Sequence, residues 1–94
     1  MEAINKVGRP LPDMELKDTV ELMLSDDYKD RFMGEFHQTR IRYFKLRRML
    51  EQWDNGELDF TPTCPRGVLQ AQLSIMEAYL DILNVRKSIE GLVK

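Results

Sequence analysis

The sequence has few of the residues from which catalytic and metal sites are built. Its 94 residues include one histidine, His37, and one cysteine, Cys64. One of each cannot supply a His/Cys metal site, and a lone cysteine cannot form an internal disulfide. The three serines lie outside any nucleophile-elbow context, and the chain has no P-loop and no GxGxxG motif. We therefore expect a protein that is not an enzyme and that has no metal and no cofactor.

Proline, glycine and long apolar runs are scarce as well. The chain has four prolines and five glycines, and no apolar run approaches the ~20 residues that span a bilayer. Charged residues make up 32% of the chain, and this composition favours one helix-rich domain over a low-complexity chain. The first residues lack the apolar core and cleavage site of a signal peptide. These absences predict a cytosolic protein without a membrane partner.

The net charge of -2 argues against general nucleic-acid binding, which usually needs a broadly basic surface. This average conceals an asymmetry along the chain. Residues 1–39 hold nine acidic and five basic residues, whereas residues 40–48 hold five basic residues and no acidic one. The basic residues of the second segment are Arg40, Arg42, Lys45, Arg47 and Arg48.

Capping signals and periodicity divide the chain into a tail and three helices. Residues 1–12 show no periodicity and predict a flexible N-terminal tail, followed by a single helical-hairpin domain over residues 13–94. Asp13 is expected to cap a short helix that runs to about Leu24. The Ser25 hydroxyl and the two acids after it predict the start of a long helix that ends near Asp54.

The second long helix is expected to begin at Pro65 after a cap from Thr63 or Cys64, and to end at Gly91. Each long helix has an apolar seam with alternating steps of four and three residues, which is typical of an antiparallel pair. The seams comprise Phe32, Phe36, Thr39, Tyr43, Leu46, Leu50 and Trp53 in the first helix, and Leu69, Leu73, Met76, Leu80 and Leu83 in the second. We therefore expect an all-α protein, an antiparallel helical hairpin with a short N-terminal helix.

Both long helices have a second apolar row beside the seam. These rows comprise Met33, His37, Ile41 and Phe44 in the first helix, and Val68, Ile75, Tyr79 and Ile82 in the second. One partner helix cannot cover two rows. The second rows therefore predict a homo-oligomer in which hairpins share a core.

The basic segment is the first candidate binding site. Arg40 and Arg47 are seven residues apart and share a helix face, with Tyr43 and Phe44 between them. Guanidinium groups beside aromatic rings can hold phosphates and stack a base. The alternative is a solvated face in which these cations form ion pairs with acids such as Glu51, Glu77 and Asp81.

The connector between the long helices is the second candidate site. Thr61, Thr63 and Arg66 cluster where the second long helix begins, and helix N-termini have unpaired N–H groups that bind anions. The alternative is an ordinary cap and turn. Tyr28, at the start of the first long helix, is expected to stack on a ligand or to pack against the N-terminal helix. For His37 the two interpretations are a packed side chain bonded to a carbonyl and a switch.

The segments LKDTVELMLSDDYKDRF and LDFTPTCPR resemble a widespread family of small phage and prophage proteins, related to a protein of gut crAss-like phages. The resemblance covers about residues 16–90. The architecture is also similar to the helical hairpin of phage sponges that sequester the signalling nucleotides of the CBASS and Thoeris defences. Those sponges are oligomers whose pockets between subunits use an aromatic side chain to stack a base and Arg or Lys to hold phosphates.

The resemblance to the sponges implies roles for particular residues. Tyr28 resembles their stacking aromatic, Arg66 resembles the arginine that opens their second long helix, and Arg40 and Arg47 would hold phosphates. The sponges' Gly-Tyr-Arg and Gly-Arg-Thr-His stretches are missing from this chain. The resemblance implies a phage anti-defence protein in the host cytosol that sequesters a cyclic or ADP-ribose-type nucleotide without cleaving it. Two alternatives stay open: a protein-binding inhibitor of a host defence enzyme, such as a CRISPR effector, and a structural helical oligomer.

Overall fold

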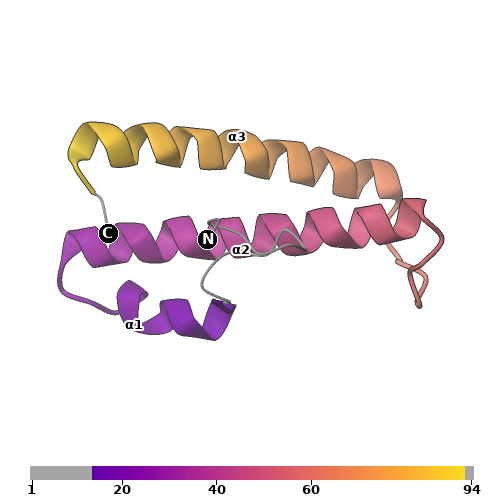
Figure 1. The fold of residues 1–94 in the computed structure, drawn as a ribbon, viewed down its shortest axis with the longest axis horizontal. Helices are drawn as coiled ribbons and strands as arrows, with labels where there is room; N and C mark the ends of the chain where they lie inside the picture. Colours follow the sequence, from indigo (N-terminus) through magenta and orange to yellow (C-terminus); the bar gives the residue numbers. More distant parts are fainter. Residues whose placement is uncertain (1–13, 93–94) are drawn as a thin grey trace, which may run out of the picture.

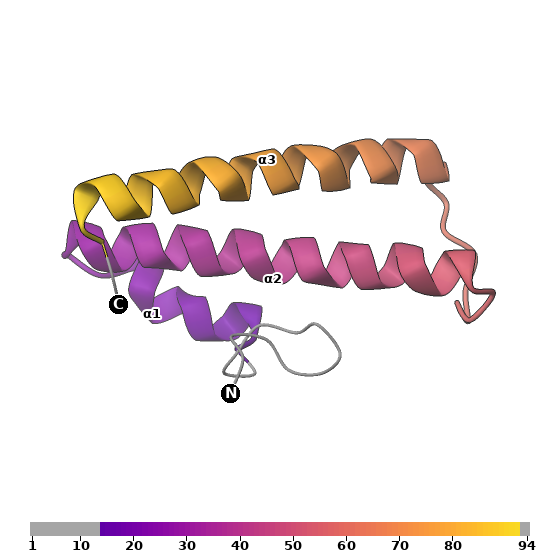
Figure 2. The same ribbon diagram turned by 45° about the horizontal axis from the view of Figure 1, so that its top comes forward.

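The computed structural model describes residues 14–92, which form helices and connecting turns. A 3-10 helix, η1 (Leu16–Thr19), continues into α1 (Val20–Met23), and two long helices follow, α2 (Tyr28–Asp54) and α3 (Arg66–Glu90). Helices α2 and α3 run antiparallel, and α1 lies on the side of α2 that faces away from α3 (Figures 1 and 2). The all-α hairpin is therefore confirmed. The expected flexible tail, residues 1–12, lies outside the described residues.

The N-terminal helix packs against α2 of the same chain. Its expected cap, Asp13, lies outside the described residues, and Glu15 is the N-cap of η1, with its amide donating to Asp18 Oδ2 at 2.8 Å. Helix α1 packs over Gly34 of α2, where an added Cβ would lie 2.8 Å from Met23 Cγ and 3.2 Å from Leu22 Cβ. A helix this short is unstable alone in water, so its position depends on this close approach.

The start of α2 follows the expected acidic signal, but with a different cap. Asp27 is the N-cap, and its carboxylate accepts a hydrogen bond from the Lys29 amide at 2.9 Å. The Ser25 hydroxyl instead accepts from the Asp27 amide at 3.0 Å and donates to Asp30 Oδ2 at 2.9 Å. Ser25 thus holds the turn before the helix, because it lies two residues too early to reach the first free amides.

The ends of α3 show one correction and one confirmed prediction. Pro65 is the N-cap residue and no side chain caps the helix, so the expected cap from Thr63 or Cys64 is wrong. At the other end, Gly91 has the left-handed conformation with φ of 68°, and the Leu92 amide donates to the Lys87 carbonyl at 2.9 Å. This turn directs Leu92 into the core, where it is buried.

The core lies between α2 and α3 and is densest near the end that carries α1. Its main cluster comprises Phe32, Met33, Phe36, Leu80, Leu83 and Leu92. The expected seam is therefore confirmed at this end, while its members Leu46, Trp53, Leu69, Leu73 and Met76 are half-buried.

The two second apolar rows have different surroundings. Met33 and Ile41 in the row of α2 are buried within the chain, so these two residues need no second subunit to cover them. In the row of α3, Val68, Ile75 and Ile82 are all more than half exposed. Of the two predicted oligomer faces, the one on α3 is therefore the one whose large apolar side chains are exposed among the described residues.

Candidate functional site

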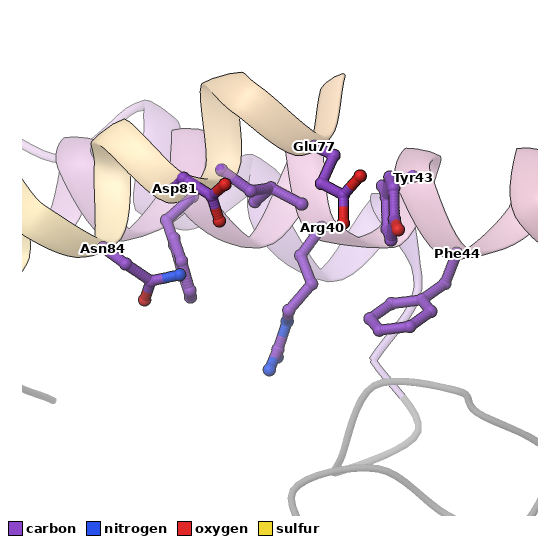
Figure 3. Close-up of a pocket in the computed structure, with 8 residues that line it drawn as sticks. Arg40, Tyr43, Phe44, Glu77, Asp81 and Asn84 are labelled. Carbon is purple, nitrogen blue, oxygen red and sulfur yellow. The ribbon is translucent and has the colours of Figure 1, made fainter. Parts of the chain in front are cut away.

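A groove of about 230 Å³ lies between α2 and α3, near the middle of the hairpin. Helix α2 contributes aromatic rings and an arginine, and α3 contributes two carboxylates and an amide (Figure 3). The lining residues are Phe36, Arg40, Tyr43, Phe44, Glu77, Leu80, Asp81 and Asn84.

Helical spacing explains why these side chains converge. Positions 36, 40, 43 and 44 recur at steps that place them on one side of α2. Positions 77, 81 and 84 do the same on α3, beside the buried Leu80. The groove is thus a product of two ordinary helix faces and needs no unusual backbone.

Arg40 is the distinctive residue of the groove. It is half-buried, its Nη2 lies 3.1 Å from His37 Nδ1, and its guanidinium carbon lies 5.6 Å from the centroid of the Phe36 ring. Its Nε is buried and has no hydrogen-bond partner among the described residues. Burial lowers the pKa of the Arg40 guanidinium from its ordinary value, yet arginine stays protonated in proteins. The groove therefore contains a cation that has no carboxylate partner among the described residues, and such a cation attracts an anion.

His37 supports Arg40 as a neutral acceptor. Burial, followed by the charges of Arg40 and Lys87, lowers the pKa of His37 to about 4. Because a guanidinium only donates hydrogen bonds, His37 Nδ1 accepts the bond and Nε2 carries the ring proton. The packed histidine is therefore confirmed, but its partner is a guanidinium and not the expected carbonyl.

The aromatic side of the groove is formed by Tyr43 and Phe44. Their rings form an edge-to-face pair, with centroids 5.3 Å apart and an interplanar angle of 72°. Figure 3 shows the Arg40 side chain extending between Asn84 on one side and Tyr43 and Phe44 on the other. An aromatic ring next to a guanidinium can stack on a planar ligand whose anionic group reaches the cation.

The carboxylates of the groove belong to Glu77 and Asp81. In the described part of the chain, neither forms a hydrogen bond or an ion pair with Arg40. The expected alternative of ion pairs between Arg40 and these acids is therefore absent. Ionised carboxylates only accept hydrogen bonds, so they would receive hydroxyl or amino groups of a ligand and would repel its phosphates.

Tyr28 lies at the end of the hairpin, far from Arg40. Its hydroxyl donates to Glu90 Oε1 at 2.9 Å and accepts from Arg86 Nη2 at 2.6 Å. Arg86 Nε also contacts Glu90 Oε2 at 3.1 Å. Tyr28 thus joins the start of α2 to the end of α3, in neither of the two roles expected from the sequence.

The other predicted binding residues have local partners. Arg47 Nε pairs with Glu51 Oε2 at 3.2 Å on an exposed helix face, which is the expected alternative for this residue. Arg66 binds both carboxylate oxygens of Asp54, at 2.8 and 2.7 Å. Thr61 and Thr63 are exposed in the connector. Among the described residues, the predicted binding residues that line the groove are therefore Arg40 and Tyr43 alone.

Sequence reasoning missed Asn84 as a lining residue. A signal was present, because Glu77, Asp81 and Asn84 form a polar row with steps of four and three beside the apolar seam. Such a row indicates a helix edge that borders a groove. Along the described residues, no group of three or more His, Cys, Asp or Glu is placed to hold a metal ion, and no helix has the length and apolarity to cross a membrane.

These features define a class of protein: a small helical hairpin whose groove combines a cation, aromatic rings and hydrogen-bond acceptors. The chain belongs to the Sequestin family, whose model matches residues 26–89. The matched region contains every lining residue of the groove and omits α1. The family name indicates a sequestering role. No curated protein and no solved structure matches the chain.

Proposed function

We propose that this member of the Sequestin family binds a small signalling nucleotide in the groove and sequesters it without breaking a bond. The ligand is of the cyclic oligonucleotide or cyclic ADP-ribose type, and the protein acts as a phage anti-defence factor in the host cytosol. The observation that carries the proposal is Arg40, a half-buried cation that lies beside three aromatic rings and has no carboxylate partner among the described residues. The family name supports sequestration, and the phage and sponge resemblances support the class of ligand.

Each side of the groove has a role in this proposal. Arg40 binds a phosphate oxygen, and the Tyr43 and Phe44 rings stack on the base. Glu77 and Asp81 accept hydrogen bonds from ribose hydroxyls or base amino groups, which keeps the phosphate on the Arg40 side. His37 keeps the guanidinium in position, since its Nδ1 lies 3.1 Å from Arg40 Nη2.

The proposed protein is a homo-oligomer. Tyr28 and Arg66 lie near opposite ends of the hairpin, because α2 alone has 27 residues and a length of about 40 Å. These two residues can therefore join one pocket only from different subunits. The exposed apolar row of α3 supports self-association.

Calorimetric titration with cyclic di- and trinucleotides and cyclic ADP-ribose isomers tests the proposal. We expect saturable binding of at least one compound, which is recovered unchanged by chromatography. The Arg40→Gln variant should bind at least about tenfold more weakly, because a charge-assisted hydrogen bond contributes roughly 1.5–3 kcal/mol. Arg42→Gln, an exposed change in the same basic segment, is the matched control and should bind like the unmodified protein.

Two results would contradict the proposal. One is the absence of binding to every compound at high micromolar concentration. The other is equal loss of binding in the Arg40→Gln and Arg42→Gln proteins, which would indicate a diffuse charge effect. Recovery of a cleaved nucleotide would show that the protein is an enzyme.

A further inference from the structure

Helix α3 has an outward face that no other described element covers. The described contacts of α3 are with α2, and α1 lies beyond α2 (Figures 1 and 2). The large apolar side chains of this face range from 41% exposed for Tyr79 to 77% exposed for Ile89. They are Val68, Ile75, Tyr79, Ile82, Val85 and Ile89.

The composition of this face suits contact with another helix. Ala71 and Ala78 lie on it between the large residues, and small residues allow two helices to approach closely. Positions 68–89 extend over about 30 Å of helix. If all six side chains were covered, two copies would bury on the order of 1,200 Å², the lower end of the range for stable interfaces.

We propose that α3 packs against α3 of a second copy, antiparallel, about a twofold axis beside Ala78 and Tyr79. In this register, the residue numbers of two positions that face each other add up to 157. Ile75 then faces Ile82, Val68 faces Ile89, and the large Tyr79 ring faces the small Ala78. Five of the six large apolar residues of the face therefore meet an apolar residue, and Val85 faces Gln72. The contact is self-complementary, as an isologous interface requires.

Charge selects this orientation over the parallel one. A parallel pair would place each residue opposite itself, so that Arg86 would face Arg86 and Tyr79 would face Tyr79. The antiparallel pair places Arg86 opposite Ala71 and leaves its ion pair with Glu90 intact. Antiparallel helices also align their dipoles favourably.

The interface leaves both nucleotide grooves open. The groove residues Glu77, Asp81 and Asn84 each follow a residue of the outward face by two positions, which is about 200° around the helix. Among these three, Asp81 is the residue beside the edge of that face, one turn before Val85. A dimer should therefore bind two ligands independently. The inference rests on the proposed function in one respect, because it specifies which surface joins the subunits of the proposed homo-oligomer. The dimer itself forms without a ligand.

Sedimentation velocity of the full chain and of charged variants tests this interface. We expect the unmodified protein to be a dimer of the 11.1 kDa chain. Ile75→Glu and Ile82→Lys should each be monomeric, with self-association weakened about 100-fold, because each change buries a charge against an apolar residue. Both positions are exposed in the monomer, so circular dichroism should show unchanged helix content.

Mixing the two variants tests the orientation. In the antiparallel register the introduced glutamate at 75 faces the introduced lysine at 82, while the remaining Ile82 and Ile75 face each other. An equimolar mixture should therefore form a heterodimer, which a parallel pair would not allow. Gln70→Glu, an exposed change on another side of α3 that preserves an acceptor for Arg66, is the control and should remain dimeric.

Three outcomes would overturn the inference. They are an unmodified chain that is monomeric at about 100 µM, an oligomer that Ile75→Glu does not affect, and a variant mixture that stays monomeric. Each of these outcomes is independent of the Arg40 binding test. Failure of the interface and failure of nucleotide binding are therefore separate results.

Discussion

Arg40 differs from Arg47, Arg66 and Arg86 in what surrounds it and not in chemistry. Arg47, Arg66 and Arg86 each have a carboxylate oxygen within 3.2 Å. Arg40 instead contacts a neutral imidazole and an aromatic ring. A cation that is partly removed from water and has no counter-charge favours an incoming anion more than a solvated, paired one does. This difference explains why one arginine of a basic segment is the better binding candidate.

The lowered pKa of His37 predicts a pH dependence of stability. The unfolded chain, with an ordinary histidine pKa, takes up a proton as the pH falls from about 6.5, whereas folded His37 does so only near pH 4. The contribution to stability is therefore complete above pH 6.5 and is lost as the pH falls toward 4. We expect a loss of about 1 kcal/mol between pH 7 and pH 5 after allowing for solvent screening.

Urea unfolding of the His37→Gln variant isolates this contribution. Glutamine does not titrate but can still accept a hydrogen bond from Arg40, so the free energy of unfolding should fall less between pH 7 and pH 5 than in the unmodified protein. The carboxylates are common to both proteins and cancel in the comparison. Identical pH dependence in the two proteins would contradict a depressed pKa for His37.

At the scale of elements, the contact between α1 and α2 depends on one missing side chain. Gly34 lies in the interior of α2, where glycine costs about 1 kcal/mol of helix stability relative to alanine. The close approach of α1 compensates for this cost. Only glycine allows that approach, because a Cβ at position 34 would lie 3.2 Å from the Met23 backbone nitrogen and also close to the Met23 side chain. Local helix propensity and tertiary packing therefore act in opposite directions at this residue.

Gly34→Ala should destabilise the protein despite alanine's higher helix propensity. We expect a net loss of about 1–2 kcal/mol, because overpacking typically costs more than the propensity gain. Denaturant unfolding measures the loss, and faster amide exchange in residues 16–24 would locate it in η1 and α1.

Gly67→Ala is the matched control for this prediction. Gly67 is in the first turn of α3, and an added Cβ there meets no atom within 4 Å. Alanine should therefore leave stability unchanged or raise it by up to about 1 kcal/mol. A stabilising Gly34→Ala change would show that α1 does not pack as described.

At the scale of the whole molecule, the groove joins the two long helices, so its ligand should stabilise the hairpin. A ligand that binds only the folded state adds about 2.7 kcal/mol at a concentration of 100 times Kd. For a chain of this size such a gain should raise Tm by roughly 10 °C or more. Thermal unfolding with and without the nucleotide measures the shift.

The Arg40→Gln protein provides the comparison for this measurement. It should unfold near the Tm of the unmodified protein without nucleotide, because Arg40 has no ion pair within the described chain to lose. Its Tm should respond much less to nucleotide. A nucleotide-induced shift that persists in this variant would place the ligand outside the groove.

The positions of the long helices followed from the sequence because the signals are local. Asp27 and Gly91 act on amides and carbonyls a few residues away, and the apolar steps of four and three define one face of each helix. The expected long helices, one from the signal at residues 25–27 to about Asp54 and one from Pro65 to about Glu90, agree with the structure to within about two residues. The caps assigned to Ser25, Thr63 and Cys64 were wrong, because capping depends on reaching a particular amide.

What the sequence alone determined is the all-α hairpin, its seam and the concentration of positive charge in residues 40–48. What only the tertiary structure decided is which of those charges is free and where the predicted site residues lie. Arg66 meets Asp54 across the connector, Tyr28 meets the end of α3, and Arg40 meets no carboxylate of the described residues. Periodicity identifies the face of a helix that is buried, but pairing depends on a few ångströms between residues from different helices, and only the packed hairpin sets those distances.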